Sequence, residues 1–302
     1  EKTYPSPDLV ARYDFEEKSL KNSVKQGAPA TLGGNKLVAG KHGNSLLANG
    51  DSIVGLPDLK IRQAHQPFSF TLWLKPAETY PQAIVFSKST NSGWNFSGYT
   101  LSLENGRLHW TLAKEFPGCA ASIASAAPIP TGEWTHITVT NDGSRKAVGM
   151  RIFINGAPAA TTVICDNFTK EITLGEKVVL AAKGSQPGLR GGMVDDFSVH
   201  LRALTELEVA LGHDEALIEK LPRKAFRDYY FSAIDPETRK LSGKLNAARA
   251  AYRIEQGKVQ EVITMRESEN PRPAYILTRG DYTIPGEKVE RETPDWLPPF
   301  PE

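Results

Sequence analysis

Short apolar runs alternate with turn residues over the first two thirds of the chain. From Asp8 to Leu204 the runs are rich in Val, Ile, Thr and aromatic residues, and Gly, Asn and Pro separate them. Many short runs of this kind, with little helical periodicity, predict an all-β sandwich or jelly roll. The predicted strands are Leu9–Glu16, Ser45–Ala48, Ser52–Gly55, Phe68–Lys75, Ala83–Ser89, Tyr99–Glu104, Arg107–Ala113, Thr135–Asn141, Met150–Ile154, Glu171–Leu174, Val178–Ala182 and Met193–His200.

Strand alternation predicts which side chains form the core. In Phe68–Lys75 a period of two places Phe68, Phe70, Leu72 and Leu74 on one face and leaves Trp73 among polar residues on the other. The same parity on neighbouring strands leaves Arg107, His109, His136 and Arg151 facing outward.

Two hairpin turns are predicted at Asn105-Gly106 and Asn155-Gly156, because Asn and Gly tolerate a positive φ. Each turn fixes the register of the strands that flank it.

The composition changes after Leu204. Residues 205–208 (TELE) have the pattern of a helix N-cap followed by an acidic first turn, so a helical connector is predicted over 205–266. We expect it either to pack on the sandwich or to stand exposed as an antiparallel helix pair. Its predicted interruptions are Pro222, Pro236 and Gly243, and one helical stripe contains Leu241, Leu245 and Ala248.

The last 36 residues contain seven prolines, which favours an extended arm without regular structure over 267–302. Its apolar residues are too many for a solvated linker, so we expect the arm to dock on this chain or on a further domain. These residues are Tyr275, Ile276, Leu277, Tyr282, Trp296 and Phe300. The predicted organisation is therefore a sandwich over 1–204, a connector over 205–266 and the arm.

Charge and composition exclude several classes of protein. The chain has 302 residues, 40% of them apolar, with 36 basic against 35 acidic residues, which indicates a folded chain with a sizeable core. Its apolar runs are shorter than the ~18 residues that a membrane-spanning helix needs, so no membrane insertion is expected. A net charge of +1 provides no field that would attract nucleic acid.

The two cysteines, Cys119 and Cys165, exclude a haem-attachment CxxCH motif and a zinc ribbon. They leave two alternatives, one disulfide or two free thiols.

Several segments resemble laminin-G-like members of the concanavalin A-like superfamily. They are residues 9–15 (LVARYDF), 70–76 (FTLWLKP), 134–144 (WTHITVTNDGS), 151–156 (RIFING), 192–197 (GMVDDF) and 202–205 (RALT), in the order that is typical of the family. This resemblance covers roughly residues 8–210 and implies a concanavalin A-like, laminin-G-like jelly-roll β-sandwich.

The tail resembles a narrower group. Residues 271–282 (PRPAYILTRGDY), 285–289 (PGEKV) and 297–299 (LPP) are similar to the segment that leads into the PSD-type domain of planctomycete PSCyt/PSD multidomain proteins of cytochrome type. The resemblance implies a fragment of a larger exported bacterial protein, at the cell surface, in the periplasm or outside the cell. Because the chain lacks CxxCH, no haem function is transferred to it.

An enzyme is disfavoured. Glycoside hydrolases of the same superfamily carry the motif E-x-D-x-x-E, and here the nearest match, Glu171 to Glu176, has Thr173 where the central Asp should be. Neither a nucleophile elbow, nor HExxH, nor a phosphate-binding glycine loop occurs.

The outward polar and aromatic side chains suit hydrogen bonding to sugar hydroxyls and stacking on sugar rings. Outer sheet faces are polar in many proteins, so the alternative for each residue is a purely structural role under a loop or helix. The candidate ligand-binding residues are Trp73, Trp94, Arg107, His109, His136 and Arg151.

The resemblance also implies calcium, which laminin-G-like domains often bind near the sandwich rim. Asp195 matches the recurring Asp of the last strand, and Asp14 and Asp51 are the candidates to join it. The alternative is that Asp195 caps or pairs at a strand edge.

The sequence therefore predicts a non-catalytic carbohydrate-binding module whose partner is a polysaccharide or surface glycan. The alternative is a structural module that scaffolds neighbouring domains of the same polypeptide. Burial distinguishes the two, because a sheet face that lies under the connector is an intramolecular interface and an open groove favours a ligand.

Overall fold

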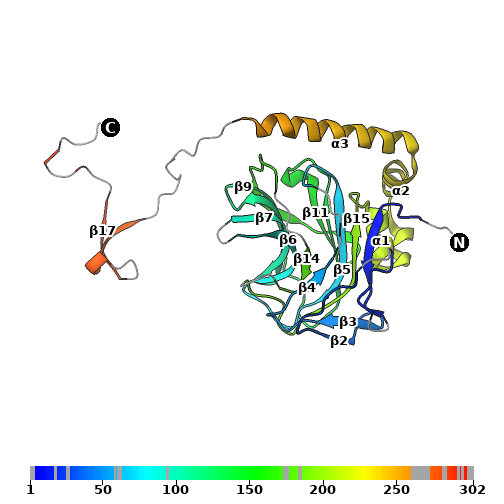
Figure 1. The fold of residues 1–302 in the computed structure, drawn as a ribbon, viewed down its shortest axis with the longest axis horizontal. Coiled ribbons are helices and arrows are strands. Elements are labelled where there is room, and N and C mark those ends of the chain that lie inside the picture. Colours follow the sequence, from blue (N-terminus) through cyan, green and yellow to red (C-terminus); the bar gives the residue numbers. More distant parts are fainter. Residues whose placement is uncertain are drawn as a thin grey trace. The chain divides into compact units, whose positions relative to one another are not determined.

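The computed structural model describes residues 4–16, 19–24, 28–57, 59, 63–92, 95–172, 177–182, 186–259, 273–280, 284–290, 293 and 296–297. The chain divides into two units, Glu1–Lys258 and Val259–Glu302. Two antiparallel sheets face each other in the first unit and form a β-sandwich, and helices lie against it (Figure 1). The predicted fold class is confirmed.

Fifteen strands of the described residues make up the sandwich. One sheet, of eight strands, contains β1 (Leu9–Tyr13), β2 (Lys36–Ala39), β3 (Asn44–Leu47), β5 (Phe68–Lys75), β10 (Thr135–Asn141), β11 (Met150–Ile154), β12 (Ala157–Pro158) and β15 (Met193–His200). The other, of seven strands, contains β4 (Val54–Leu56), β6 (Ala83–Ser92), β7 (Asn95–Glu104), β8 (Arg107–Glu115), β9 (Cys119–Ser125), β13 (Thr161–Asp166) and β14 (Val178–Leu180).

The order of strands puts β5 near the middle of the eight-stranded sheet. The order is β12-β11-β10-β5-β15-β3-β2, and β1 also pairs with β15. β3 pairs with the beginning of β15 and β1 with its end, so both occupy the same side of that strand. In the seven-stranded sheet the order is β13-β9-β8-β7-β6-β14-β4.

An aromatic cluster joins the two sheets. Phe70 of β5 lies with its ring centroid 4.5 Å from that of Phe86 and 6.0 Å from that of Trp110, both in the opposite sheet. The indole Nε1 of Trp110 donates to the carbonyl oxygen of Thr140, across the sandwich, at 3.0 Å. This bond satisfies the polar atom of a fully buried side chain and fixes the two sheets relative to each other.

The predicted inward faces are correct. Phe68, Phe70, Leu72 and Leu74 are all completely buried. The predicted turns are also correct, because Asn105-Gly106 and Asn155-Gly156 adopt positive φ at both positions, as hairpin turns of the primed type require.

Four strands of the sandwich were missed, and the described part of the predicted strand Glu171–Leu174 is not a strand. The missed strands are β2, β9, β12 and β13. β9 (CAASIAS) is buried along its whole length, so small residues replace the alternation that a half-exposed strand shows. Glu171 and Ile172 are not in a strand, and Thr173 and Leu174 lie outside the described residues.

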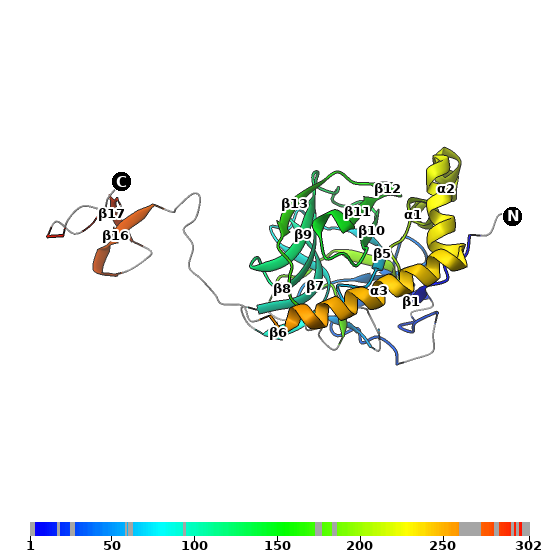
Figure 2. The ribbon, with the colours of Figure 1, turned by 90° about the horizontal axis from the view of Figure 1, so that it is seen from above.

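The connector consists of helices against the sandwich. They are α1 (Glu206–His213), η3 (Glu215–Lys220), α2 (Arg223–Tyr229), the π-turn η4 (Tyr230–Ile234) and α3 (Pro236–Gly257); one 3₁₀ turn, η2 (Ala147–Gly149), precedes β11. α3 runs along one side of the sandwich (Figure 2). The predicted interruption at Gly243 is wrong, since α3 continues through it at the modest cost of one glycine in a helix. Pro236 starts α3 because its missing N–H is not needed there.

The second unit contains a hairpin of β16 (Ala274–Leu277) and β17 (Pro285–Val289), with the turn η5 (Thr278–Gly280). The prediction of an arm without regular structure is wrong here, because Pro285 stands first in its strand, where proline is tolerated. The apolar side chains of the hairpin are exposed, and docking of the arm stays a prediction. Tyr282 and Phe300 lie outside the described residues.

Both cysteines are free thiols, so the disulfide alternative is wrong. Cys165 of β13 pairs in register with Ser122 of β9, which is three positions from Cys119. Three positions span ~10 Å along a strand and reverse the face, which is beyond the reach of a disulfide. The Cys119 thiol instead accepts the backbone N–H groups of Thr169 and Lys170.

The first helix is fixed to the sheet by buried polar contacts. The hydroxyl of Ser69 in β5 donates to the carbonyl of Arg202 and accepts the N–H of Leu204. The Arg202 guanidinium forms a buried bidentate ion pair with Glu208 of α1, and Glu208 also accepts the N–H of Thr205. Phe153, Leu204 and Val209 complete the contact as a small apolar cluster.

Among the described residues no helix is long and apolar enough to span a bilayer.

Replacing Glu208 by Leu is expected to lower the free energy of unfolding by ~3 kcal/mol, because Arg202 would lose its buried bidentate partner and keep the longer pair with Asp8, at 3.4 Å. The double variant Arg202→Met/Glu208→Leu should recover most of that loss. Urea unfolding measures both, and Asp51→Asn serves as control, since the exposed Arg190–Asp51 pair should contribute less than ~1 kcal/mol. Equal losses of unfolding free energy in all three variants would contradict the assignment of Arg202 and Glu208 as a buried ion pair.

Candidate functional site

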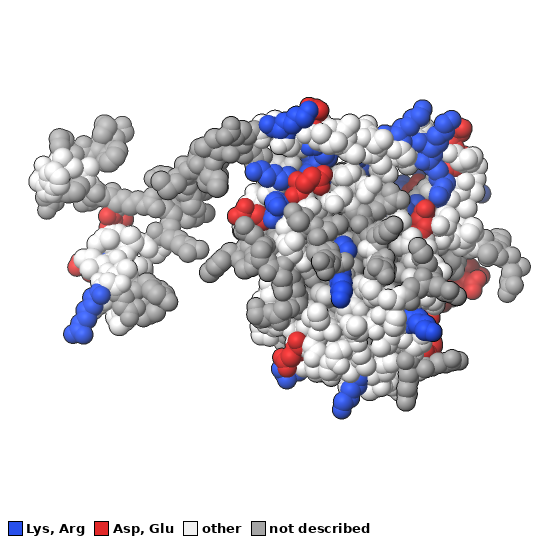
Figure 3. Space-filling model, viewed as in Figure 1, with Lys and Arg blue, Asp and Glu red and all other residues white. Residues whose placement is uncertain are grey.

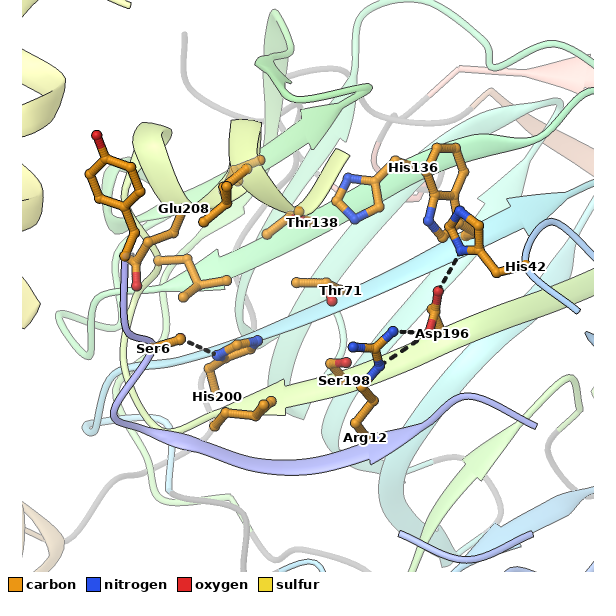
Figure 4. A pocket seen from close by; sticks show the side chains of 17 residues that line it. Ser6, Arg12, His42, Thr71, His136, Thr138, Asp196, Ser198, His200 and Glu208 are labelled. Carbon is orange, nitrogen blue, oxygen red and sulfur yellow. Dashed lines mark hydrogen bonds and ion pairs between the residues drawn. The ribbon is translucent and has the colours of Figure 1, made fainter. Parts of the chain in front are cut away.

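A cavity of 290 Å³ lies on the outer face of the eight-stranded sheet, between β1, β15, β5, β10 and α1. Its floor is the outward side of β5 and its neighbours, and α1 forms a wall (Figure 4). The sheet provides side chains from four adjacent strands, so their positions follow directly from strand register.

A row of hydroxyl groups crosses the floor. Thr138 of β10 pairs with Thr71 of β5, and Thr71 pairs with Ser198 of β15. Ser198 pairs in turn with Arg12 of β1. Because neighbouring strands lie ~4.8 Å apart, the three hydroxyls span ~10 Å and end at a guanidinium.

Two buried polar atoms on this floor have no hydrogen-bond partner among the described residues. They are the Oγ1 of Thr138, which is completely buried, and the Nδ1 of His136, whose residue is 4% exposed. An unsatisfied buried donor or acceptor costs ~1–3 kcal/mol. Neither atom is exposed while α1 is in place, so a ligand or water can supply the missing partners only if α1 moves away from the floor.

Trp73 forms one end of the cavity and is itself enclosed. It pairs in register with His136, and the rings of His42, His136 and His213 lie with centroids 5.1 to 5.7 Å from the indole. The Lys41 ammonium lies 4.6 Å from the ring centroid. With 4% of its surface exposed, Trp73 acts as a wall and leaves no open ring face for the predicted sugar stacking.

The charged groups of the cavity are paired internally. The Asp196 carboxylate accepts a hydrogen bond from the Nη2 of Arg12 at 2.7 Å. Its other oxygen lies 2.7 Å from the Nδ1 of His42 (Figure 4). Asp196 has a positive φ at a bulge in β15, which turns its carboxylate toward both partners. The cavity therefore offers neutral hydrogen-bonding groups and no free charge of its own along this edge.

Burial keeps two histidines neutral. Desolvation, and secondarily the nearby His213, lowers the pKa of His136 to about 4. Desolvation also lowers the pKa of His200 to about 4, and its Nδ1 lies 3.2 Å from the Ser6 hydroxyl. At neutral pH both imidazoles can therefore donate with one nitrogen and accept with the other.

The predicted ligand-binding residues divide between the two sheets, and of those that the structure describes only Trp73 and His136 line the cavity. Arg107 and His109 lie on β8 of the other sheet, where Arg107 donates to the Ser125 carbonyl and His109 lies 3.6 Å from Glu104. Arg151 lies on β11 outside the cavity, with Glu206 of α1 at 3.9 Å. Trp94 lies outside the described residues.

The three carboxylates proposed for calcium are engaged separately. Asp195 is completely buried and accepts the backbone N–H groups of Lys41, His42 and Asp196; burial raises its pKa to about 6. Asp51 pairs with Arg190, and Asp14 accepts the N–H of Glu16. In the part of the chain that the structure describes, no three His, Cys, Asp or Glu side chains are grouped as metal ligands. Calcium binding stays a prediction.

Asp195 has a positioning role instead. By holding the backbone of Lys41 and His42 it places those two side chains beside Trp73 and Asp196. Arg12, Thr71, Asp196 and Ser198 were not among the predicted site residues. Strand alternation places Arg12 and Thr71 on the outer face, but the bulge between Asp195 and Ser198 interrupts the alternation in β15. Only the pairing of distant strands shows that the four residues are neighbours.

Acid should destabilise the fold through His136. A histidine with a lowered pKa contributes stability above pH 6.5, and that stability is lost as the pH falls from 6.5 toward 4. His136→Gln should therefore make the free energy of unfolding less pH-dependent, by up to ~3 kcal/mol between pH 7 and pH 4.

Urea unfolding of both proteins at a series of pH values measures this difference. Asp195 titrates in the opposite sense, because its raised pKa relieves a cost as the pH falls, so the variant is compared with the parent chain at each pH. Parallel curves for the two proteins would show that His136 does not titrate as a buried group.

Solved structures share this fold at low identity. The binding domain of Paraclostridial Mosquitocidal Protein 1 is 18% identical, with a TM-score of 0.56, over 70% of this chain and 53% of that one. The botulinum neurotoxin serotype D binding domain is 16% identical, with a TM-score of 0.54, over 68% and 51%. This chain thus spans about half the length of these toxin domains.

A third structure matches over nearly its whole length. Domain 4 of AbnA, a GH43 extracellular arabinanase from Geobacillus stearothermophilus, solved in complex with arabinotriose, is 21% identical, with a TM-score of 0.51, over 68% of this chain and 98% of that one. At such identities these structures show the fold alone.

The sequence itself matches a family. No curated protein matches the chain. The laminin-G-type family model described as the concanavalin A-like lectin/glucanases superfamily matches residues 48–210, more than half of the chain, from β4 to α1. The chain therefore belongs to the concanavalin A-like lectin/glucanases superfamily.

Proposed function

We propose that this domain is a non-catalytic carbohydrate-binding module that holds a short neutral saccharide segment in the cavity under α1. The observation that carries the proposal is the pair of unsatisfied buried atoms, Thr138 Oγ1 and His136 Nδ1, beside a row of hydroxyls. Sugar hydroxyls donate and accept hydrogen bonds, so a saccharide that enters as α1 moves aside can satisfy both atoms.

The charges support a neutral ligand. Arg12 and His42 are already paired with Asp196, and Arg202 is paired with Glu208. A charged ligand would have to break one of these pairs or remain uncompensated in a partly buried site, and both are costly. A neutral sugar meets no such cost.

The size supports a short segment. A cavity of 290 Å³ lies at the lower limit of the ~300–1,000 Å³ that is typical of small-molecule sites. We infer that one or two sugar rings enter it, as the end of a longer chain or as a branch.

One solved structure with this fold supports this class of ligand by analogy. The arabinanase domain that matches over 98% of its length was solved with arabinotriose, and the toxin domains are named as binding domains. Fold similarity alone does not transfer a ligand, so this agreement is an argument by analogy.

The module is proposed without a catalytic role. Glu171 is engaged by the Arg253 guanidinium at 2.9 Å and by the His65 Nδ1 at 3.3 Å. Thr173 and Glu176 lie outside the described residues. A module of this kind gains affinity when it is linked to other binding domains, as in the exported bacterial multidomain protein that the tail resemblance implies.

Thr138→Val tests the proposal, because it removes the unsatisfied hydroxyl while preserving the shape of the side chain. It should leave the free energy of unfolding unchanged or higher, yet weaken saccharide binding at least about tenfold through the loss of one hydrogen bond. Isothermal titration against arabino-oligosaccharides and a panel of neutral and sulfated polysaccharides, with calcium and with a chelator, measures binding.

The matched control is Thr111→Val on the outer face of the other sheet, where Thr111 bonds to Ser122 at 2.7 Å. It should leave binding intact. The proposal fails if no polysaccharide binds saturably, if only charged ones bind, or if both valine variants weaken binding equally.

A second function is the scaffolding of neighbouring domains. It is favoured because α1 covers part of the same outer face of the eight-stranded sheet. α1 lies over His136, with Gly212 so close that an added Cβ would stand 3.5 Å from its ring, and Phe153 is buried against Leu204 and Val209. Part of the outer face is thus an intramolecular interface. If no polysaccharide of the panel bound, scaffolding would be the better supported function.

A further inference from the structure

The helix α3 is held to the sandwich by its polar side. Arg249 donates to the Asp142 carbonyl at 2.7 Å, and Arg253 pairs with Glu171 at 2.9 Å. Near its start, Arg239 pairs with Asp8 at 3.0 Å. Arg145 of the sandwich reaches Gln256 at 3.0 Å. Polar contacts thus hold the helix to the sandwich near its start, in its second half and at its end.

The apolar side chains form a separate stripe. Leu241, Leu245, Ala248 and Tyr252 follow one another at intervals of four, three and four residues, and all four are exposed. Leu241 is 60% exposed, Leu245 51% and Tyr252 64%. The spacing is that of the a and d positions of a coiled-coil heptad, which form a narrow seam for one partner helix.

Positive charge borders this seam. In the heptad frame Lys244 precedes an a position and Arg249 follows a d position, so the two stand on opposite flanks. Lys240 lies one turn before Lys244, on the flank away from the sandwich. Neither lysine forms an ion pair with any residue that the structure describes. Figure 3 shows Lys and Arg side chains along the edge of the molecule where α3 runs.

The seam and its flanks define the partner. A parallel second copy of α3 would set Lys244 against Arg249 of that copy, and such like-charge pairs are unfavourable. A membrane surface would require a broad apolar face, whereas this stripe is one seam wide. Acidic residues beside an apolar seam would complement Lys240 and Lys244 on the flank away from the sandwich. Arg249 on the other flank, in contrast, already donates to the Asp142 carbonyl.

From this juxtaposition we infer that α3 is a docking site for an amphipathic helix with leucine or isoleucine at its seam and glutamate or aspartate on its flanks. The helix would lie along Leu241–Tyr252 in the helix-in-groove mode. This inference is independent of the saccharide site, because it concerns a different surface of the same unit.

The test uses two fluorescein-labelled synthetic peptides of four heptads with leucine at a and d. One carries glutamate at e and g, and the other carries lysine there. Fluorescence anisotropy against the full chain should show saturable binding of the acidic peptide, at least tenfold tighter than that of the basic one. Leu241→Ser/Leu245→Ser should abolish it, and Lys240→Glu/Lys244→Glu should reverse the preference between the peptides.

The matched control is Val163→Ser, which removes an equally exposed apolar side chain from β13, on a different surface of the sandwich. It should leave binding unchanged, and circular dichroism verifies that each variant is folded. Equal binding of both peptides, or of neither, would overturn the inference. So would a self-associated chain in sedimentation velocity, or binding to phosphatidylglycerol vesicles, if Leu241→Ser/Leu245→Ser removed it.

Discussion

The alternation of side chains along β5 is the constraint on which the site depends. Phe70 and Leu72 are locked in the core against the opposite sheet, and the backbone then has no freedom left to move the residues between and beside them. Thr71 and Trp73 consequently point outward at fixed positions. Because β10 and β15 are hydrogen-bonded on either side, His136, Thr138 and Ser198 are positioned by the same packing. A rigid scaffold of this kind holds its binding groups before any ligand arrives, which reduces the entropic cost of binding.

The helix α1 covers the outer face of the eight-stranded sheet and so encloses the cavity. Without α1, the row of hydroxyls would be an ordinary polar outer face, in contact with bulk water. Ser69, Arg202 and Glu208 hold the start of the helix on that face, so Thr138 and His136 lose their water without gaining protein partners. Burial under α1 thus costs stability at these two residues, as is frequent at functional sites, and the proposed saccharide would recover part of that cost.

The sequence was informative about local structure and less so about long-range neighbours. The inward residues of β5, the turns at Asn105 and Asn155 and the helix start at Thr205 follow from period, turn chemistry and capping, which are local properties. β9 was not predicted, because full burial removes the alternation of apolar and polar residues. Trp73 and His136 were predicted to face outward, and they do, but their burial under α1 depends on a helix more than 60 positions away in the sequence. Arg12 and Asp196 are 184 positions apart, so only the topology of the sheet unites them.

The attachment of α3 has a consequence for how the unit responds to its surroundings. Arginine contacts with carbonyl groups and carboxylates hold this helix, and mobile ions screen the partly exposed Arg239–Asp8 pair at its start more than the pair made by the buried Arg253 near its end. The sandwich depends on apolar burial, which salts such as sulfate strengthen. A concentrated salt solution therefore loosens the start of the helix first, while it makes the sandwich more compact.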